Sequence, residues 1–237
     1  MKIKFLIYII IIYTLYIIYL NYYSTVIFKK CIKCGESKLY FVNCKIPFKI
    51  RKRILNLFNN NPTKLNNMLN FTKGAKIDYN QIQSYDPTII KYFINKNLLK
   101  TCRKAINKNI SFAPNSENYK LFFRLYENNG DKLNWHYDNN FTKGERYTLV
   151  IPLFVDKCNT SKLMIKDRKT SIEKKINIPF GKAIIFNAST VFHKVSHQTN
   201  GCKRLVAIIP LYEDYNLSYF GKSRKNIRDI TFNILSL

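Results

Sequence analysis

Leu133–Asp138, with the sequence LNWHYD, places a histidine and an aspartate two positions apart near the middle of a chain of 237 residues. Side chains alternate between the two faces of a β-strand, so His136 and Asp138 point the same way if this stretch is extended. An imidazole beside a carboxylate supplies two of the three ligands in the facial triad that holds non-haem Fe(II). The stretch therefore predicts a metal site whose third ligand comes from elsewhere in the chain.

The third ligand has few candidates, because the chain contains only three histidines. His193 lies in an apolar, strand-like stretch, whereas His197 lies in the polar segment 196–200. We predict that His193 completes the triad and that His197, the rival, is a surface or substrate-side residue.

The residues around these histidines show the period of two that is typical of β-strands, with turn residues between the strands. The predicted strands cover residues 119–126, 135–138, 147–155, 162–165, 176–178, 183–186, 191–195 and 203–211. Helical patterns precede them. Residues 50–58 have apolar residues on one face of a helix and basic residues on the other. A longer helix is predicted from Asp86 and Pro87 through Ile106, with Asp86 as its N-cap. Helices followed by short, evenly spaced strands predict an α+β, mainly β fold, namely a double-stranded β-helix (jelly roll) backed by N-terminal helices.

Residues 5–28 are almost entirely apolar and are followed by Lys29 and Lys30. A helix of this length crosses the hydrocarbon core of a bilayer, and no small-residue cleavage site follows it. We therefore predict a single transmembrane helix that anchors the chain in a membrane. Lysines flank the segment on both sides, and their excess after it favours a cytoplasmic domain without deciding the side.

The formal net charge of +26 indicates an acidic partner, such as nucleic acid or an anionic lipid surface, although AT-rich coding would produce the same excess of lysine. Six cysteines are too few for a disulfide scaffold. Cys31, Cys34 and Cys44 could hold a zinc ion, or form a disulfide with one free thiol.

Several motifs follow one another in an order that resembles a known family. Tyr126 lies on a strand ten residues before His136, and the strand-like stretches 146–153 and 181–186 separate the two halves of the metal motif. His193 is followed by Val195, Gly201 and the basic pair Lys203-Arg204. Over residues 119–212 the chain resembles the Fe(II)/2-oxoglutarate-dependent dioxygenases, and among them the prolyl 4-hydroxylase-like branch.

The resemblance implies a set of roles. His136, Asp138 and His193 would be the metal ligands and catalytic centre, and Tyr126 would bind the cosubstrate 2-oxoglutarate. A cation would pair with the far carboxylate of that cosubstrate. Lys203 has the usual spacing, whereas Arg204 has the planar fork that suits a carboxylate, and the two face opposite ways on a strand. Fe(II), 2-oxoglutarate and O2 would be the cofactors, with ascorbate as a further candidate.

The implied reaction is hydroxylation of a C–H bond with decarboxylation of 2-oxoglutarate to succinate. A prolyl or lysyl side chain of a peptide or protein is the first-choice substrate. The alternatives are an AlkB-like oxidative demethylase of nucleic acid, and a non-catalytic basic protein of the same fold that binds membrane surfaces or nucleic acid. Residues 159–162 replace a Gly-Gly pair of the family, which leaves the substrate side open.

We expect four regions along the chain. Residues 1–28 would be the membrane anchor, 29–115 a juxtamembrane and helical support region, 116–213 the jelly-roll core, and 214–237 a tail packed on that core.

Overall fold

The computed structural model describes residues 38–60, 63–65, 71–167, 170–199, 201–218, 221–222 and 225–226, with the single residues 8, 11, 13 and 15. The predicted transmembrane helix, residues 1–28, lies outside the described residues except for those four. Within the described part, no helix is both long and apolar enough to cross a membrane.

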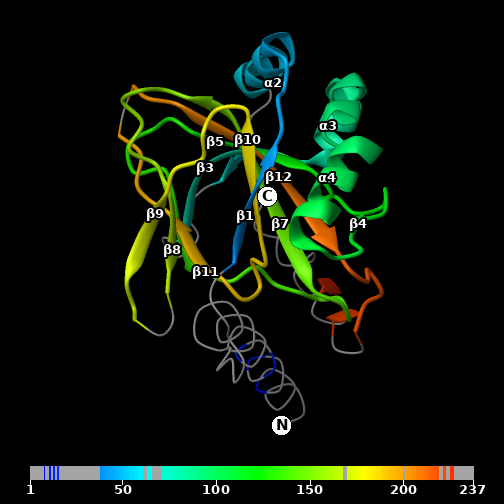
Figure 1. Cartoon of the computed structure of the whole chain (residues 1–237). Helices are drawn as coiled ribbons and strands as arrows, with labels where there is room; N and C mark the ends of the chain where they lie inside the picture. The colour runs from blue at the N-terminus through cyan, green and yellow to red at the C-terminus, as the bar shows by residue number, and fades with distance from the viewer. Residues whose placement is uncertain are drawn as a thin grey trace.

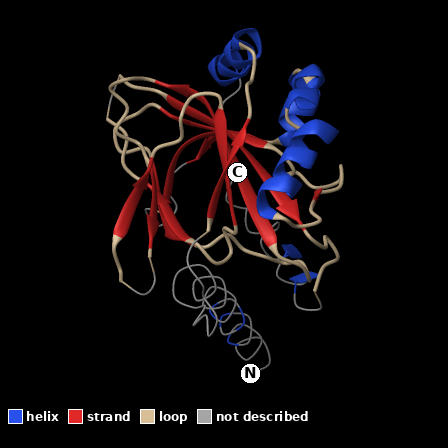
Figure 2. Ribbon diagram, viewed as in Figure 1, coloured by secondary structure: helices blue, strands red, loops and turns tan. Residues whose placement is uncertain are grey.

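Antiparallel strands form a strongly curled sheet that folds over into two facing layers, with the helices α2, α3 and α4 on the outside (Figures 1 and 2). The strand order is β1-β10-β7-β12-β5-β3-β6-β11-β8-β9, with β2 beside β3 and β4 beside β12. In this spatial order, the larger layer consists of β1, β10, β7, β12 and β5, and the smaller layer consists of β6, β11, β8 and β9. This mainly β arrangement agrees with the predicted jelly roll. The strands are β1 Leu39–Asn43, β2 Thr63–Leu65, β3 Thr72–Ile77, β4 Ser111–Phe112, β5 Phe122–Tyr126, β6 Lys132–His136, β7 Arg146–Val155, β8 Leu163–Lys166, β9 Glu173–Ile176, β10 Lys182–Phe186, β11 Phe192–Val195 and β12 Arg204–Tyr212.

Strand β12 shows how the sequence separates two interiors. Leu205, Ala207 and Ile209 belong to the core between the larger layer and the helices. Arg204 and Val206, on the alternate face, line the space between the two layers. Strand periodicity thus places one apolar core outside the curl and one cavity inside it.

Strand β3 connects the two layers. Its last residues pair with β5, from Ala75 to Ile77, and its first residues, Thr72 and Lys73, pair with β6. Gly74 lies at the crossing with a φ of 138°, and a Cβ there would lie 2.8 Å from the carbonyl oxygen of Leu125. The crossing therefore requires glycine, both for its backbone conformation and for space.

The helices differ in part from expectation. Residues 50–58 lie in α2, Phe48–Asn60, as predicted. The continuous helix predicted from Asp86 is wrong: it is split into the 3-10 helix η3, Pro87–Tyr92, and the α-helix α4, Lys96–Ile106. The side chain of Asn95 caps α4 by accepting a hydrogen bond from the amide of Leu98 at 2.9 Å.

Asp86 has another role, because its carboxylate pairs with Arg53 and accepts a hydrogen bond from Thr88. The short helix α3, Tyr79–Tyr85, and the strands β1 to β4 are present as well, although the sequence patterns did not indicate them.

Candidate metal centre

Three side chains of types that bind metal ions lie close together at one end of the smaller layer. His136 is the last residue of β6, and it pairs directly with His193 of β11 in the strand register. Asp138 follows two residues later, and its amide donates a hydrogen bond to the carbonyl of Ala188 at 2.8 Å. One ligand atom from each of the three residues lies within 4.8 Å of the others. The structure thus brings together the three residues that the sequence predicted as ligands.

Both imidazoles present the same nitrogen to this group. Nδ1 of His136 lies 2.7 Å from the carbonyl oxygen of Asn134, and Nδ1 of His193 lies 2.9 Å from that of Val191. A carbonyl only accepts hydrogen bonds, so each Nδ1 is the protonated nitrogen. The lone pair of each Nε2 is then available to a cation, and each ring orientation is fixed by a backbone contact.

The two oxygens of Asp138 have different surroundings. Oδ1 lies 3.5 Å from Nε2 of His136 and 3.8 Å from Nε2 of His193. Oδ2 accepts a hydrogen bond from Oγ1 of Thr148 at 2.7 Å and lies 3.3 Å from Nη2 of Arg146. Thr148 and Arg146 therefore hold the carboxylate so that Oδ1 faces the imidazoles.

The protonation states suit a divalent cation. Burial would raise the pKa of Asp138, but Arg146 and the two histidines together hold it well below its usual range. Burial, followed by the neighbouring His136, lowers the pKa of His193 to about 4. At neutral pH, Asp138 is ionised and His193 is neutral, which are the forms that bind metal.

A cavity of about 380 Å³ opens between the two layers and includes the three ligands in its wall. Tyr126 of β5 and Arg204 of β12 are directly paired and are both buried there. The guanidinium carbon of Arg204 lies 5.4 Å from the centre of the Tyr126 ring, and its buried Nη1 has no hydrogen-bond partner among the described residues. An unsatisfied buried cation is costly, so this atom fits an anionic ligand.

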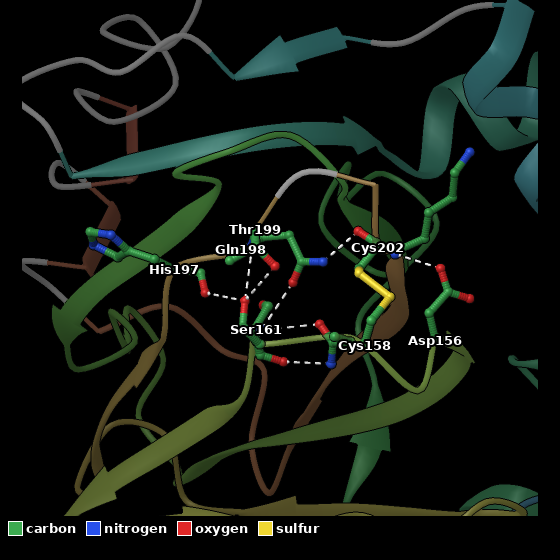
Figure 3. The surroundings of a disulfide bond; sticks show 10 residues. Asp156, Cys158, Ser161, His197, Gln198, Thr199 and Cys202 are labelled. Carbon is green, nitrogen blue, oxygen red and sulfur yellow. Dashed lines mark hydrogen bonds between the residues drawn. A yellow bond between two sulfur atoms is a disulfide. The ribbon is translucent and has the colours of Figure 1, made fainter.

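The other predicted site residues lie elsewhere. Lys203 is not part of the cavity wall, and its Nζ pairs with Glu127 at 3.2 Å on the surface. His197 is exposed on a loop and is not part of the ligand group; its carbonyl accepts a hydrogen bond from Thr160 at 3.0 Å (Figure 3).

The loop that precedes Arg204 is fixed by a disulfide between Cys158 and Cys202 (Figure 3). Nε2 of the Gln198 side chain donates a hydrogen bond to the carbonyl of Cys202, and Oε1 of the same side chain accepts one from the backbone amide of Ser161 at 2.9 Å. This network joins the loop after β7 to the start of β12.

Sequence reasoning missed the disulfide, Arg146, Thr148 and Arg124. The disulfide has no signal in spacing, because its cysteines are 44 positions apart. The three polar residues could have been found by strand parity, since each lies two positions from an inward-facing residue on its strand. Of the three N-terminal cysteines, Cys44 is a free thiol whose burial raises its pKa to about 11, and the other two lie outside the described residues.

The fold is that of the 2-oxoglutarate/Fe(II) oxygenases. One similar structure is the α-ketoglutarate-dependent epimerase SnoN from nogalamycin biosynthesis, with a TM-score of 0.58 and 12% identity over 78% of this chain and 82% of that chain. Another is EctD from S. alaskensis, solved with 2-oxoglutarate and 5-hydroxyectoine, with a TM-score of 0.54 and 11% identity over 74% and 72%. A prolyl-4-hydroxylase from Pseudomonas putida has a TM-score of 0.50 and 12% identity over 74% and 92%.

No family model and no curated protein matches the sequence. The three similar structures differ in activity and have comparable, low identity. The likeness therefore shows the fold and does not single out the prolyl 4-hydroxylase-like branch.

Proposed function

We propose that the chain is an Fe(II)- and 2-oxoglutarate-dependent dioxygenase that hydroxylates a C–H bond. The observation that supports this best is one cavity that holds two imidazoles and one carboxylate, with ligand atoms within 4.8 Å of one another, and a buried arginine whose Nη1 has no hydrogen-bond partner among the described residues. Two histidines and one carboxylate on one side of a metal leave its other positions open, as non-haem Fe(II) oxygenases require.

Each residue has a defined role in this proposal. His136, Asp138 and His193 bind Fe(II), and Arg204 pairs with the far carboxylate of 2-oxoglutarate while the Tyr126 hydroxyl orients it. When bound, the metal and cosubstrate would supply O2 activation coupled to decarboxylation of 2-oxoglutarate to succinate and CO2. The protein positions the reacting groups in the cavity between the two layers.

The supporting residues fix this geometry. The ring of Phe71 contacts His136 edge-on at 5.7 Å between centroids, and the ring of Phe186 contacts His193 edge-on at 5.2 Å. Thr148 and Arg146 restrain Asp138. Rigid packing around the ligands keeps the donor atoms close together before the metal binds.

A peptide prolyl or lysyl side chain is the first-choice substrate, on the basis of the resemblance alone. Oxidative demethylation of nucleic acid is the second candidate, which the net charge of +26 favours. A non-catalytic basic protein of the same fold that binds membrane surfaces or nucleic acid is the third. Membrane attachment through residues 1–28 and assistance by ascorbate belong to the same proposal.

The test uses the full chain in detergent with anaerobic Mn(II) binding by calorimetry and aerobic succinate release with Fe(II). His136→Ala should abolish both, because one of three ligands is lost. His197→Ala is the matched control, since it removes an exposed histidine outside the ligand group, and it should change neither property.

Two results would reject the enzyme. One is Mn(II) binding and succinate release that survive His136→Ala. The other is salt-sensitive binding of RNA, DNA or anionic vesicles with no succinate release from any peptide or oligonucleotide tested, which would favour the non-catalytic protein.

A further inference from the structure

The cavity contains more positive charge than the metal and cosubstrate require. Among the described residues in its wall, Asp138 is the only acid, whereas Lys76, Arg124, Arg146 and Arg204 are cations. Arg146 is paired with Asp138, which leaves the other three for ligands or for neighbours outside the cavity.

Lys76 forms an ion pair with Asp78, and one cosubstrate molecule does not satisfy both Arg124 and Arg204. 2-Oxoglutarate has two carboxylates: one belongs with its 2-oxo group at the metal, and the other pairs with Arg204 in the proposed function. No carboxylate of the cosubstrate remains for Arg124. Arg124 also lies near enough to Arg204 to lower its pKa, after the larger effect of burial, so the two guanidinium groups repel each other without an intervening anion.

The contacts of Arg124 leave part of its side chain unsatisfied. Nη2 donates a hydrogen bond to Oγ1 of Thr72 at 3.0 Å, and Nη1 donates a long one to the hydroxyl of Tyr126 at 3.3 Å. Its buried Nε has no hydrogen-bond partner in the part of the chain that the structure describes. Both protein acceptors are neutral hydroxyls, so no carboxylate in the described cavity wall neutralises this cation.

A second cation lies directly beside it. Lys76 of β3 is the strand partner of Arg124 of β5. Its Nζ forms an ion pair with Oδ2 of Asp78 at 3.7 Å and lies 4.8 Å from the centre of the Tyr119 ring. Asp78 therefore offsets part of the charge of Lys76, which adds to the positive field at Arg124 as a neighbour.

This wall is next to the metal centre. Thr72, which binds Arg124, follows Phe71, and the ring of Phe71 contacts His136. Phe122 lies two residues before Arg124 on the same face of β5 and lines the same cavity. An anion at Arg124 would therefore be part of a molecule that lies beside the metal, against aromatic rings.

We propose that Arg124, assisted by Lys76, binds a carboxylate or phosphate group of the substrate and so selects anionic substrates. The inference rests on the proposed function for the identity of the metal and cosubstrate. Arg124 would act in specificity, holding the substrate by its anion while an apolar part lies toward the metal.

The test measures binding of matched probes to the full chain in detergent, loaded with Mn(II) and 2-oxoglutarate. Phenylacetate and phenyl phosphate are the anionic probes, and phenylacetamide is the neutral counterpart. Calorimetry should show the anionic probes binding at least tenfold more tightly than the amide. Arg124→Met should abolish this preference, and Arg124→Lys should retain part of it.

Arg53→Met is the matched control, because it removes an arginine of α2 outside the cavity wall, and it should leave the preference unchanged. A tetrapeptide that contains aspartate, compared with its asparagine counterpart, distinguishes an anion within a peptide from one on a small molecule. A preference for either anionic form that depends on Arg124 supports the proposal.

Affinity for 2-oxoglutarate separates Arg124 from the cosubstrate site. Arg124→Met should change it less than threefold, whereas Arg204→Met should weaken it strongly. Equal losses in the two variants would overturn the proposal and assign Arg124 to the cosubstrate. No anionic preference in the wild-type protein, or one that survives Arg124→Met, would also overturn it. If the wild-type protein binds neither Mn(II) nor 2-oxoglutarate, the proposed function fails first, and the same probe titrations on the metal-free protein still decide the role of Arg124.

Discussion

In the proposed function, one of two neighbouring basic residues pairs with the cosubstrate, and their surroundings favour Arg204. Arg204 is buried in the cavity with an unpaired Nη1, and Lys203 pairs with Glu127 outside it. Loss of hydrogen bonds to a charged group costs about 2 kcal/mol, which corresponds to roughly thirtyfold in affinity. Arg204→Met should therefore raise the Kd for 2-oxoglutarate about thirtyfold in calorimetry, and Lys203→Met should leave it within twofold. The reverse order would assign the role to Lys203.

A variant of Thr148 tests whether metal affinity depends on the position of the Asp138 carboxylate. Its hydroxyl donates a hydrogen bond to Oδ2, and valine has the same shape without the donor. Loss of such an outer contact typically weakens metal affinity about 10- to 100-fold. Thr148→Val should show this loss in a Mn(II) titration, while Thr190→Val, whose hydroxyl donates a hydrogen bond to the carbonyl of Asn187, should not. Equal affinity in both variants would mean that Arg146 alone is sufficient.

His193 makes the metal-free protein sensitive to acid. Its pKa is lowered to about 4 in the folded state from 6.5, so between these values the unfolded chain binds a proton that the folded chain excludes. Stability is then lost as the pH falls from 6.5 toward 4. The free energy of unfolding should be about 2 kcal/mol lower at pH 5 than at pH 7 from this residue.

Urea denaturation in the presence of a chelator measures this difference. His193→Gln should flatten the pH dependence between pH 5 and 7, and His197→Gln, at an exposed position, should preserve it. An unchanged slope in His193→Gln would show that another group is responsible.

At the scale of elements, Gly74 determines how β3 changes partners between the two layers. Gly74→Ala would place a Cβ 2.8 Å from a backbone oxygen at a φ of 138°, whereas Gly201→Ala, with a φ of 80°, meets nothing within 4 Å. Strained backbone conformations cost about 1–3 kcal/mol, and the clash adds to this cost only at Gly74. Thermal unfolding should therefore show a larger loss in Gly74→Ala than in Gly201→Ala. Similar losses would indicate that β3 moves to accept the side chain.

The strands of the core were predictable because their patterns are local. Each of the eight predicted strands overlaps one of β5 to β12, since alternation between the two faces of a sheet is a local pattern. Strands β1 and β3 were missed. β1 lies at the outer edge, where its burial pattern is irregular, and β3 is interrupted by Gly74 and divides its pairing between two partners.

The break between η3 and α4 shows where a periodic pattern misleads. The apolar positions of residues 89–106 fit one helix, yet Asn95 caps a new helix, and its side chain also bonds the carbonyl of Lys91 at 3.2 Å. Side-chain capping of this kind competes with helix continuation, and periodicity does not register it. The three predicted ligands are near one another because His136 and His193 face each other in adjacent strands, and no local pattern gives such pairing.

At the scale of the whole molecule, the disulfide bears on the side of the membrane. Lysine counts favoured a cytoplasmic domain, but disulfides persist mainly in oxidising compartments. We therefore propose that residues 1–28 anchor the chain in a membrane and that the described domain lies on the oxidising side of that membrane. In sealed microsomes the domain should resist added protease until detergent is present. Digestion without detergent would place it on the cytoplasmic side.

The same disulfide should also matter for stability and for the cavity. Cys158 and Cys202 close a loop with a sequence separation of 44, and closure of such a loop stabilises a protein by roughly 4 kcal/mol in the chain-entropy description. Because Cys202 lies two residues before Arg204, the freed loop should also position that guanidinium less well. A Cys158→Ser/Cys202→Ser double variant should unfold at lower urea and bind 2-oxoglutarate more weakly, whereas Cys102→Ser, which removes a buried free thiol, should lose stability without losing affinity for the cosubstrate. Lower stability with unchanged 2-oxoglutarate affinity in the double variant would show that β12 holds Arg204 without help from the loop.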